Sequence, residues 1–118
     1  MASKKTVVFD FDGVIHSYKS GWQGETVIPD PPVDGIKESI DSIRASGYKV
    51  VVVSTRCACY EGLVAIWEWL KKYDIAVDDV SKEKPPAICY VDDRAIRFDG
   101  NAESLMEKIQ NFKSWTER

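Results

Sequence analysis

The sequence predicts a single α/β domain built on a doubly wound parallel sheet, in a three-layer Rossmann-like arrangement. Short apolar segments alternate with amphipathic segments of helical periodicity over short connections, as parallel strand–helix–strand units require. The apolar segments are continuous rather than alternating, which is typical of strands covered on both faces. A length of 118 residues, with 44% hydrophobic and 30% charged residues, suits one globular domain spanning residues 1–118.

The first predicted strand, residues 7–9, leads directly into two carboxylates, Asp10 and Asp12, and then into Gly13. Because side chains alternate along a strand, both carboxylates lie on one side, at the edge where open α/β sheets bind ligands. Two like charges this close are costly unless a cation or a shared proton relieves them, and Mg²⁺ prefers oxygen ligands. The pattern D-x-D is also common in solvated turns, so the prediction depends on the rest of the chain.

Residues 14–29 form the next segment, in which glycines and polar residues interrupt the apolar ones. We expect a flap here that overhangs the carboxylates. Its Trp22 either stacks on a base or sugar of a substrate or packs the flap against the domain. Asp30 is expected to cap a helix that opens with two prolines and ends before Gly47. The apolar residues of this helix recur at helical spacing: Val33, Ile36, Ile40 and Ile43.

The strongest strand signal is the β-branched stretch 50–53, which ends in Ser54, Thr55 and Arg56. An amphipathic helix is predicted over residues 60–73. Its apolar stripe consists of Leu63, Ile66, Trp67 and Leu70. Three further short strands are expected, at residues 75–77, 87–91 and 96–98. A last helix carries the apolar residues Leu105, Met106, Ile109 and Phe112.

The carboxyl ends of parallel strands share one edge of a sheet, so residues that follow separate strands are brought together at that edge. In this chain, such residues are Asp10, Asp12, Ser54, Thr55, Asp92 and Asp93. Each of these pairs follows an apolar strand, and this repeated placement is harder to reach by chance than D-x-D alone. The sequence therefore predicts a polar site at this edge.

The order of these residues resembles that of the haloacid dehalogenase-like (HAD) phosphohydrolases. Residues 10–14, DFDGV, are similar to the first motif of that family, D-x-D-G-[TV], and the apolar strand ending in Ser54 is similar to the second. Lys84, followed by two prolines, matches the lysine of the third motif, and residues 92–93 resemble the acidic fourth motif. The resemblance runs from Thr6 onward and is also to small uncharacterised members, some of them phage-encoded.

The resemblance implies hydrolysis of phosphomonoesters through an aspartyl-phosphate. Asp10 would attack phosphorus, and Asp12 would protonate the leaving oxygen and then deprotonate the hydrolytic water. Ser54 would bind phosphoryl oxygens, and Lys84 would offset their charge. Asp93 would support the metal or its waters, or orient Lys84. Mg²⁺ would be the cofactor, and the expected metal-site residues are Asp10, Asp12 (through its backbone carbonyl), Asp92 and Asp93.

Several alternatives stay open for individual residues. Thr55 competes with Ser54 for the phosphate, because Ser54 can instead cap the strand end. Lys82 competes with Lys84, which is preferred because prolines follow it. Arg56 would contact substrate or pair with the nearby carboxylates. The expected substrate-binding residues are Gly13, Trp22, Ser54, Thr55 and Arg56.

The sixteen residues between Gly13 and Asp30 cannot hold a folded cap domain, so we expect a capless, open site. An open site suits a large phosphorylated substrate, such as a nucleotide or a nucleic-acid end, or a small substrate enclosed by a second subunit of a homo-oligomer. Arg94, beside the acidic motif, would contact such a substrate or pair with the carboxylates. The net charge of −3 disfavours polymeric nucleic acid, which needs clustered Lys and Arg.

No apolar run is long enough to span a membrane, and residues 1–5 lead into a strand without the apolar core of a signal peptide, so a cytoplasmic protein is expected. A bacterial receiver domain uses similar residues, but its acidic pair comes first and its phosphoacceptor later, which is not the order found here. The remaining alternative is a catalytically idle HAD-fold module that binds phosphate or a nucleotide without turnover.

Overall fold

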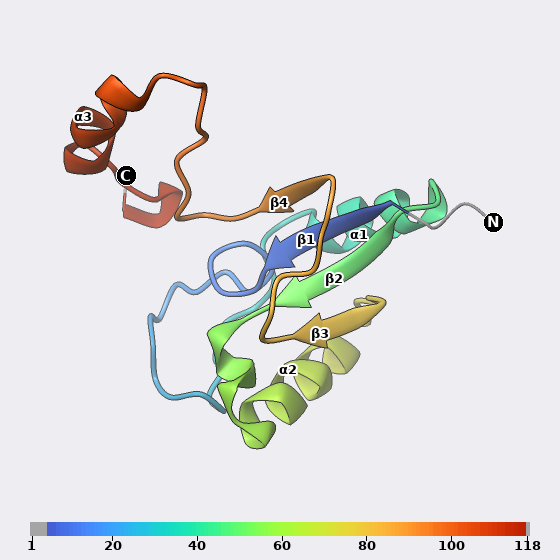
Figure 1. Cartoon of the computed structure of the whole chain (residues 1–118). Coiled ribbons are helices and arrows are strands. Elements are labelled where there is room, and N and C mark those ends of the chain that lie inside the picture. Colours follow the sequence, from blue (N-terminus) through green and yellow to red (C-terminus); the bar gives the residue numbers. More distant parts are fainter. Residues whose placement is uncertain (1–4, 118) are drawn as a thin grey trace.

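The computed structural model describes residues 5–117. Residues 1–4 and residue 118 lie outside the described residues, and residues 1–4 belong to the N-terminal stretch from which a cytoplasmic protein was predicted. The fold is a parallel four-stranded sheet of order β3-β2-β1-β4 with helices beside it (Figure 1). The strands are β1 (Thr6–Asp10), β2 (Lys49–Val53), β3 (Asp79–Ser81) and β4 (Cys89–Val91). The predicted α/β class is confirmed, and the architecture is consistent with a Rossmann-like three-layer fold.

Strand register explains which residues meet at the carboxyl edge. In the centre of the sheet, Asp10 at the end of β1 is paired with Val53 at the end of β2. On the other side of β1, Phe9 is paired with Val91, the last residue of β4. The residues that follow β2 and β4 therefore emerge beside Asp10.

The core lies between the sheet and helices α1 (Ile36–Ala45) and α2 (Tyr60–Lys72). The strand residues that face these helices are Val7, Phe9, Val50 and Val52, and the helices contribute Ile40, Ile66, Trp69 and Leu70. On the other face of the sheet, Val8, Val51 and Val53 are also buried, and Ala87 in the connection before β4 packs against them. Burial of both faces is why β1 and β2 have continuous apolar sequences.

Helix α1 begins later than predicted, and the capping role expected of Asp30 is wrong. The helix begins at Ile36 after Gly35, which has φ 82° and makes no side-chain cap hydrogen bond. The Asp30 carboxylate is already used, because it accepts hydrogen bonds from the backbone N–H (2.8 Å) and the hydroxyl (2.6 Å) of Ser20. The predicted end of the helix is confirmed, since Gly47 follows it with φ 95°.

The third strand lies at Asp79–Ser81 rather than at residues 75–77. Ile75 instead closes the end of α2 through a backbone hydrogen bond to Leu70 and is buried in the core. Residues 76–78 carry the chain back to β2, where the Asp78 backbone N–H donates to the carbonyl of Val50. An apolar stretch that ends a helix and one that forms a strand have the same composition, so the sequence alone did not distinguish them.

The C-terminal part departs most from the prediction. The fourth strand covers only Cys89–Val91 and is exposed rather than buried, and residues 96–98 form no strand. The last helix, α3 (Leu105–Gln110), follows a 3-10 turn at Ala102–Ser104 and ends before Phe112. Figure 1 shows α3 standing away from the sheet, beyond its carboxyl edge. Among the described residues, no helix has the length and apolar character needed to cross a bilayer.

Candidate active site

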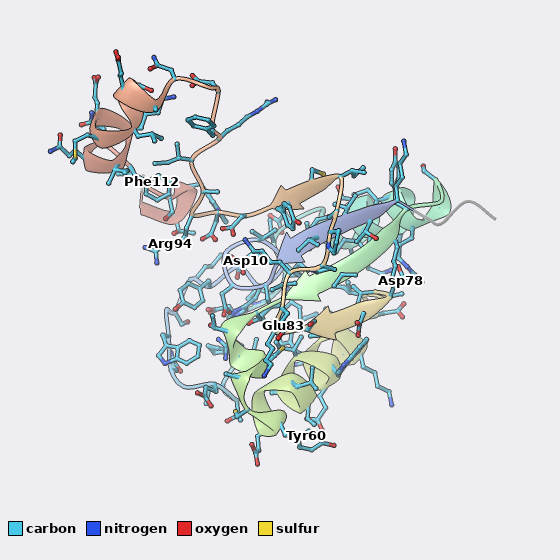
Figure 2. All side chains as sticks on the ribbon, viewed as in Figure 1. Asp10, Tyr60, Asp78, Glu83, Arg94 and Phe112 are labelled. Atoms are coloured by element: carbon cyan, nitrogen blue, oxygen red, sulfur yellow. The ribbon has the colours of Figure 1, made fainter. Side chains whose placement is uncertain are left out.

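Three carboxylates meet at the carboxyl edge of the sheet, and we call them the acidic cluster: Asp10, Asp92 and Asp93. One oxygen from each lies within 4.8 Å of the others. Asp10 ends β1, and the other two follow β4, so the parallel pairing of these strands brings them together. Figure 2 shows Asp10 at this edge, with Asp78 at the opposite end of the strands.

Two features of the acidic cluster indicate that it lacks a positively charged partner. Burial, the hydrogen bond to Asp93 and the negative charge of Asp92 together raise the pKa of Asp10 to about 7, against the opposing effect of a hydrogen bond from the Phe11 backbone. Oxygen Oδ1 of Asp93 is buried without a hydrogen-bond partner. A divalent cation would relieve both conditions, and carboxylate oxygens are the ligands that Mg²⁺ prefers. The donor set therefore fits a magnesium ion.

Gly13 is needed because the turn after β1 passes directly against this cluster. Its φ is 84°, and a Cβ atom there would overlap the Asp93 carboxylate. Its backbone carbonyl accepts a hydrogen bond of 2.7 Å from Trp115 Nε1. In the structure, Gly13 thus makes room for an acidic residue and anchors the C-terminal segment.

The Asp12 side chain points to a different set of partners and lies outside the acidic cluster. Its Oδ1 is 2.8 Å from His16 Nδ1, and its Oδ2 accepts a 2.9 Å bond from Arg56 Nε. Burial alone would raise the pKa of Asp12, but its hydrogen bonds to His16 and Arg56 and the positive charge of Arg56 together hold that pKa below its usual range. The Asp12 carboxylate is therefore ionised at neutral pH.

Arg56 is fully buried and pairs with the acidic side chain, the second of its two predicted alternatives. Besides Asp12, its guanidinium donates through Nη1 to the backbone carbonyls of Gly24 (2.8 Å), Glu25 (2.9 Å) and Val27 (3.1 Å). These carbonyls belong to residues 14–29, the flap. Arg56 therefore ties the flap and Asp12 to the turn that follows β2.

His16 is a polar site residue that the motif analysis did not select. It is fully buried, and its Nε2 accepts a 3.2 Å hydrogen bond from the backbone N–H of Asp30. Since Nε2 is the acceptor, Nδ1 carries the ring proton and donates it to Asp12. A histidine four residues after Asp12 was visible in the sequence, but only the fold of the flap shows that the two side chains meet.

Ser54 and Thr55 border the acidic cluster from the end of β2. The Ser54 hydroxyl accepts a 3.1 Å hydrogen bond from the Arg56 backbone N–H and caps a 3-10 turn, Thr55–Ala58. The capping alternative for Ser54 is thus what the structure shows. Ser54 and Thr55 also line the cavities on both sides of Asp10, so each remains placed for contact with a phosphate.

Lys84 is a cation that approaches the acidic cluster. Its Nζ lies 3.8 Å from Oδ2 of Asp92 and 5.3 Å from the centre of the Tyr90 ring. The side chain is 56% exposed and lines the same cavity as Asp10. Lys82 lines the same cavity.

Two cavities flank Asp10. One, of about 260 Å³, lies on the side of Lys82 and Lys84. The other, of about 410 Å³, lies between the flap and the C-terminal segment. Its lining residues outside the acidic edge include Tyr18, Trp22, Arg94, Ser114 and Thr116. Trp22 is 52% exposed and its ring lies 4.6 Å from the Arg56 guanidinium carbon, so it both holds the flap and faces this cavity.

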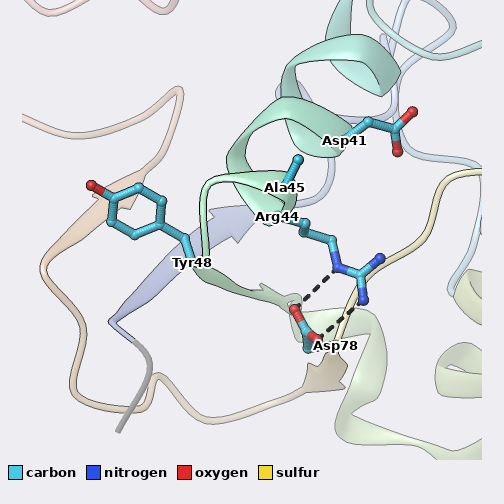
Figure 3. A pocket seen from close by; sticks show the side chains of 5 residues that line it. All are labelled: Asp41, Arg44, Ala45, Tyr48 and Asp78. Atoms are coloured by element: carbon cyan, nitrogen blue, oxygen red, sulfur yellow. Dashed lines mark hydrogen bonds and ion pairs between the residues drawn. The ribbon is translucent and has the colours of Figure 1, made fainter. Parts of the chain in front are cut away.

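A further cavity of about 310 Å³ lies at the amino end of the sheet (Figure 3). It is bordered by Arg44 and Asp78, which are joined by hydrogen bonds of 3.3 and 3.2 Å. Asp78 also accepts a 2.7 Å hydrogen bond from the Val50 backbone. These polar groups serve the connection between α1 and the strands, far from the acidic cluster.

No family model matches this chain, and no curated relative matches it. Solved structures match its fold. A crystal structure of a structural-genomics target from Vibrio cholerae is 21% identical, with a TM-score of 0.53, over 90% of this chain and 97% of that chain. Two structures of the Pnkp1/Rnl/Hen1 complex, one described as an RNA repair complex, are 22% and 18% identical, with TM-scores of 0.56 and 0.52. They are matched over 94% and 98% of this chain but only 37% and 35% of theirs, and the likeness shows the fold alone.

Proposed function

We propose that this chain is a Mg²⁺-dependent phosphomonoester hydrolase of the HAD type. The observation that carries the proposal is the acidic cluster, with a buried unpartnered oxygen on Asp93 and a lysine beside Asp92, at the carboxyl edge of a parallel sheet. The motif order in the sequence and the likeness to proteins of an RNA repair complex support it.

In the proposed reaction, a carboxylate oxygen of Asp10 attacks phosphorus, a P–O bond forms, and the bond to the leaving oxygen breaks. Asp12 gives that oxygen a proton, and the alcohol leaves. Asp12 then accepts a proton from the water that attacks the aspartyl-phosphate, which releases phosphate and restores Asp10. Mg²⁺, held by Asp10, Asp92 and Asp93, would supply the positive charge that reduces repulsion between nucleophile and phosphate.

The hydrogen bonds of Asp12 to Arg56 and His16 favour the second half-reaction over the first. Arg56 and His16 favour the ionised carboxylate, which suits the step in which Asp12 takes a proton from water. The first step needs a protonated Asp12 unless the leaving group departs without a proton. We therefore expect substrates with acidic leaving groups, such as aryl phosphates, to react faster than alkyl phosphates.

The larger cavity suits a nucleotide or a nucleic-acid end carrying the phosphate. Tyr18 and Trp22 offer aromatic surfaces on one side, and Arg94 lies on the other, so a base or sugar beside the phosphate would have partners. A negative overall charge favours a short ligand over a long polymer.

The deciding experiment measures phosphate release from an aryl phosphate and a panel of nucleoside monophosphates, with Mg²⁺ and with EDTA. Turnover should require Mg²⁺ and vanish in Asp10→Asn, whereas Asp41→Asn, an exposed carboxylate far from the site, should retain it. Binding of Mg²⁺ and nucleotide to well-folded protein without turnover on any substrate would instead favour the idle binding module.

A further inference from the structure

The C-terminal arm, residues 95–113, leaves the domain and returns to it at the same place, beside Gly13. At its start, Asp93 lies against Gly13; just past its end, Ser114 is buried and Trp115 donates a 2.7 Å hydrogen bond to the Gly13 carbonyl. Between these two anchors, the arm carries α3 outward, beyond the carboxyl edge of the sheet (Figures 1 and 2).

The arm exposes large apolar side chains. Phe98 is 60% exposed, Met106 65% and Ile109 59%, on a helix and a loop that otherwise follow the amphipathic pattern of a packed element. The arm contains equal numbers of acidic and basic residues, so its charge would not repel another copy of this chain.

Strand β4 exposes a second apolar surface on the same chain. Ile88 and Tyr90, two residues apart and so on one face of the sheet, are 54% and 46% exposed, and among the described strands β4 is an edge strand next to β1. In parallel α/β sheets, a helix that follows a strand ordinarily covers such a surface. Here that helix is α3, but its two anchors hold it beyond the other end of β4 from Ile88.

We propose that a second copy of this chain supplies the cover: the arm of each copy packs on the β4 surface of the other in a two-fold dimer. An arm fixed at both ends cannot cover its own Ile88 without losing the Trp115 anchor, whereas the arm of a two-fold partner can. The contact is reciprocal, as isologous symmetry requires. Five large apolar side chains on each copy, with the surrounding backbone, offer a surface on the order of the roughly 800 Å² per partner that a stable dimer buries.

The dimer would also shape the larger cavity beside Asp10. Arg94, Ser114 and Thr116, which line this cavity, flank the arm at its two ends. Docking of the arm would therefore fix one wall of the cleft. The proposal rests on surface geometry and does not depend on the proposed hydrolase activity.

The test measures the mass of the full chain by sedimentation velocity across the micromolar range. The wild type should be a dimer, and Ile109→Glu on the arm and Ile88→Lys beside β4 should each give a folded monomer. The double variant should regain the dimer, because opposite charges then meet at both contacts. Tyr60→Glu, an equally drastic change at an exposed site on α2, should leave the dimer intact.

Three results would overturn the proposal. These are a wild type that is monomeric at every concentration, a dimer that survives both single substitutions, and open-ended association in place of a closed dimer. Circular dichroism of each variant checks that the loss of the dimer is not a loss of folding, and both substituted positions are exposed in the structure.

Discussion

Arg56 is the side chain that joins Asp12 to the flap. Its guanidinium is fully buried, makes two hydrogen bonds to Asp12 and donates to three flap carbonyls. A buried charge that loses part of such a partner set is strongly destabilising, because the desolvation cost is no longer offset. Lysine retains the charge but lacks the planar fork that fits a carboxylate and several carbonyls at once.

The substitution Arg56→Lys should therefore lower the free energy of unfolding by about 3 kcal/mol and reduce kcat/KM at least tenfold. Thermal and urea unfolding together with phosphatase kinetics measure the two effects. The matched control is Arg44→Lys, which alters the part-exposed pair with Asp78 and should cost no more than about 1 kcal/mol. Equal losses in both variants would contradict the special role of Arg56.

Asp10 makes the stability of the metal-free protein dependent on pH. Its folded-state pKa of about 7 lies above the ordinary value of 3.8, so between these values the folded state binds more protons than the unfolded state. The stability that the protonated carboxyl contributes is thus fully present below about pH 4 and is lost as pH rises through 7. The physical cause is mainly burial, with repulsion by the neighbouring carboxylates.

Mg²⁺ should consequently stabilise the protein more at pH 8 than at pH 5, because it binds the ionised cluster. Thermal melts at pH 5, 6, 7 and 8, with and without MgCl₂, test this. In Asp10→Asn, the fall in stability between pH 4 and 7 should be smaller than in the wild type. A Mg²⁺ effect that is independent of pH, or identical in Asp10→Asn, would argue against a metal at this cluster.

At the scale of elements, the flap is held by Arg56 in two ways. The guanidinium donates hydrogen bonds to backbone carbonyls of the flap, and the Trp22 ring lies over the same guanidinium. A cation–π contact of this kind contributes about 0.5–2 kcal/mol. Because Trp22 also lines the larger cavity, its removal should affect substrates that place a base there more than those that do not.

For Trp22→Ala, we expect the KM for nucleoside monophosphates to rise severalfold, with little change in kcat and a smaller change for inorganic or small alkyl phosphates. Steady-state kinetics on both substrate types measure this difference. Trp67→Ala, on the exposed side of α2, is the control and should change neither KM. A uniform loss of kcat would instead indicate that Trp22 only supports the flap.

Helix α2 packs closely against the turn after β2 at Gly62. A Cβ atom at this position would overlap the backbone carbonyl of Arg56. Alanine is the better helix former by about 1 kcal/mol, but the overlap is with backbone and cannot be relieved by a rotamer change.

We therefore expect Gly62→Ala to destabilise the fold by about 1–3 kcal/mol and to disturb the Arg56 cradle, which would lower kcat/KM. Urea unfolding and kinetics report the two effects. Glu68→Ala, an exposed change on the same helix, should be close to neutral. A stabilised Gly62→Ala variant would show that the turn moves freely relative to α2.

At the scale of the whole molecule, the exposed β4, the outward α3 and the flap define a small domain with an open cleft at one edge of its sheet. Two apolar surfaces of one chain are exposed together, on the arm and beside β4. This is the arrangement that two copies can bury reciprocally, and the sedimentation measurement above decides whether they do.

Much of the fold was predictable because strand and helix patterns are local. The continuous valines of β2, the apolar stripe of α2 and the glycine after α1 each specify their element within a few residues of sequence. The convergence of Asp10, Asp92 and Asp93 was also predictable, since parallel pairing alone brings the ends of neighbouring strands to one edge. The position of the third strand and the start of α1 were not, because Ile75 and Asp30 found tertiary partners that their neighbours in sequence do not reveal.

The sequence by itself thus determined the fold class and the meeting of Asp10 with Asp92 and Asp93 at one edge of the sheet, because these follow from periodicity and topology. Only the tertiary structure decided that Asp12 turns away from the cluster to Arg56 and His16, that the flap is bound to Arg56, and that α3 leaves β4 exposed. The physical reason is range. Sequence patterns encode which side chains a segment buries, whereas a hydrogen bond between residues 12 and 56, or between 13 and 115, depends on where separate segments are brought together.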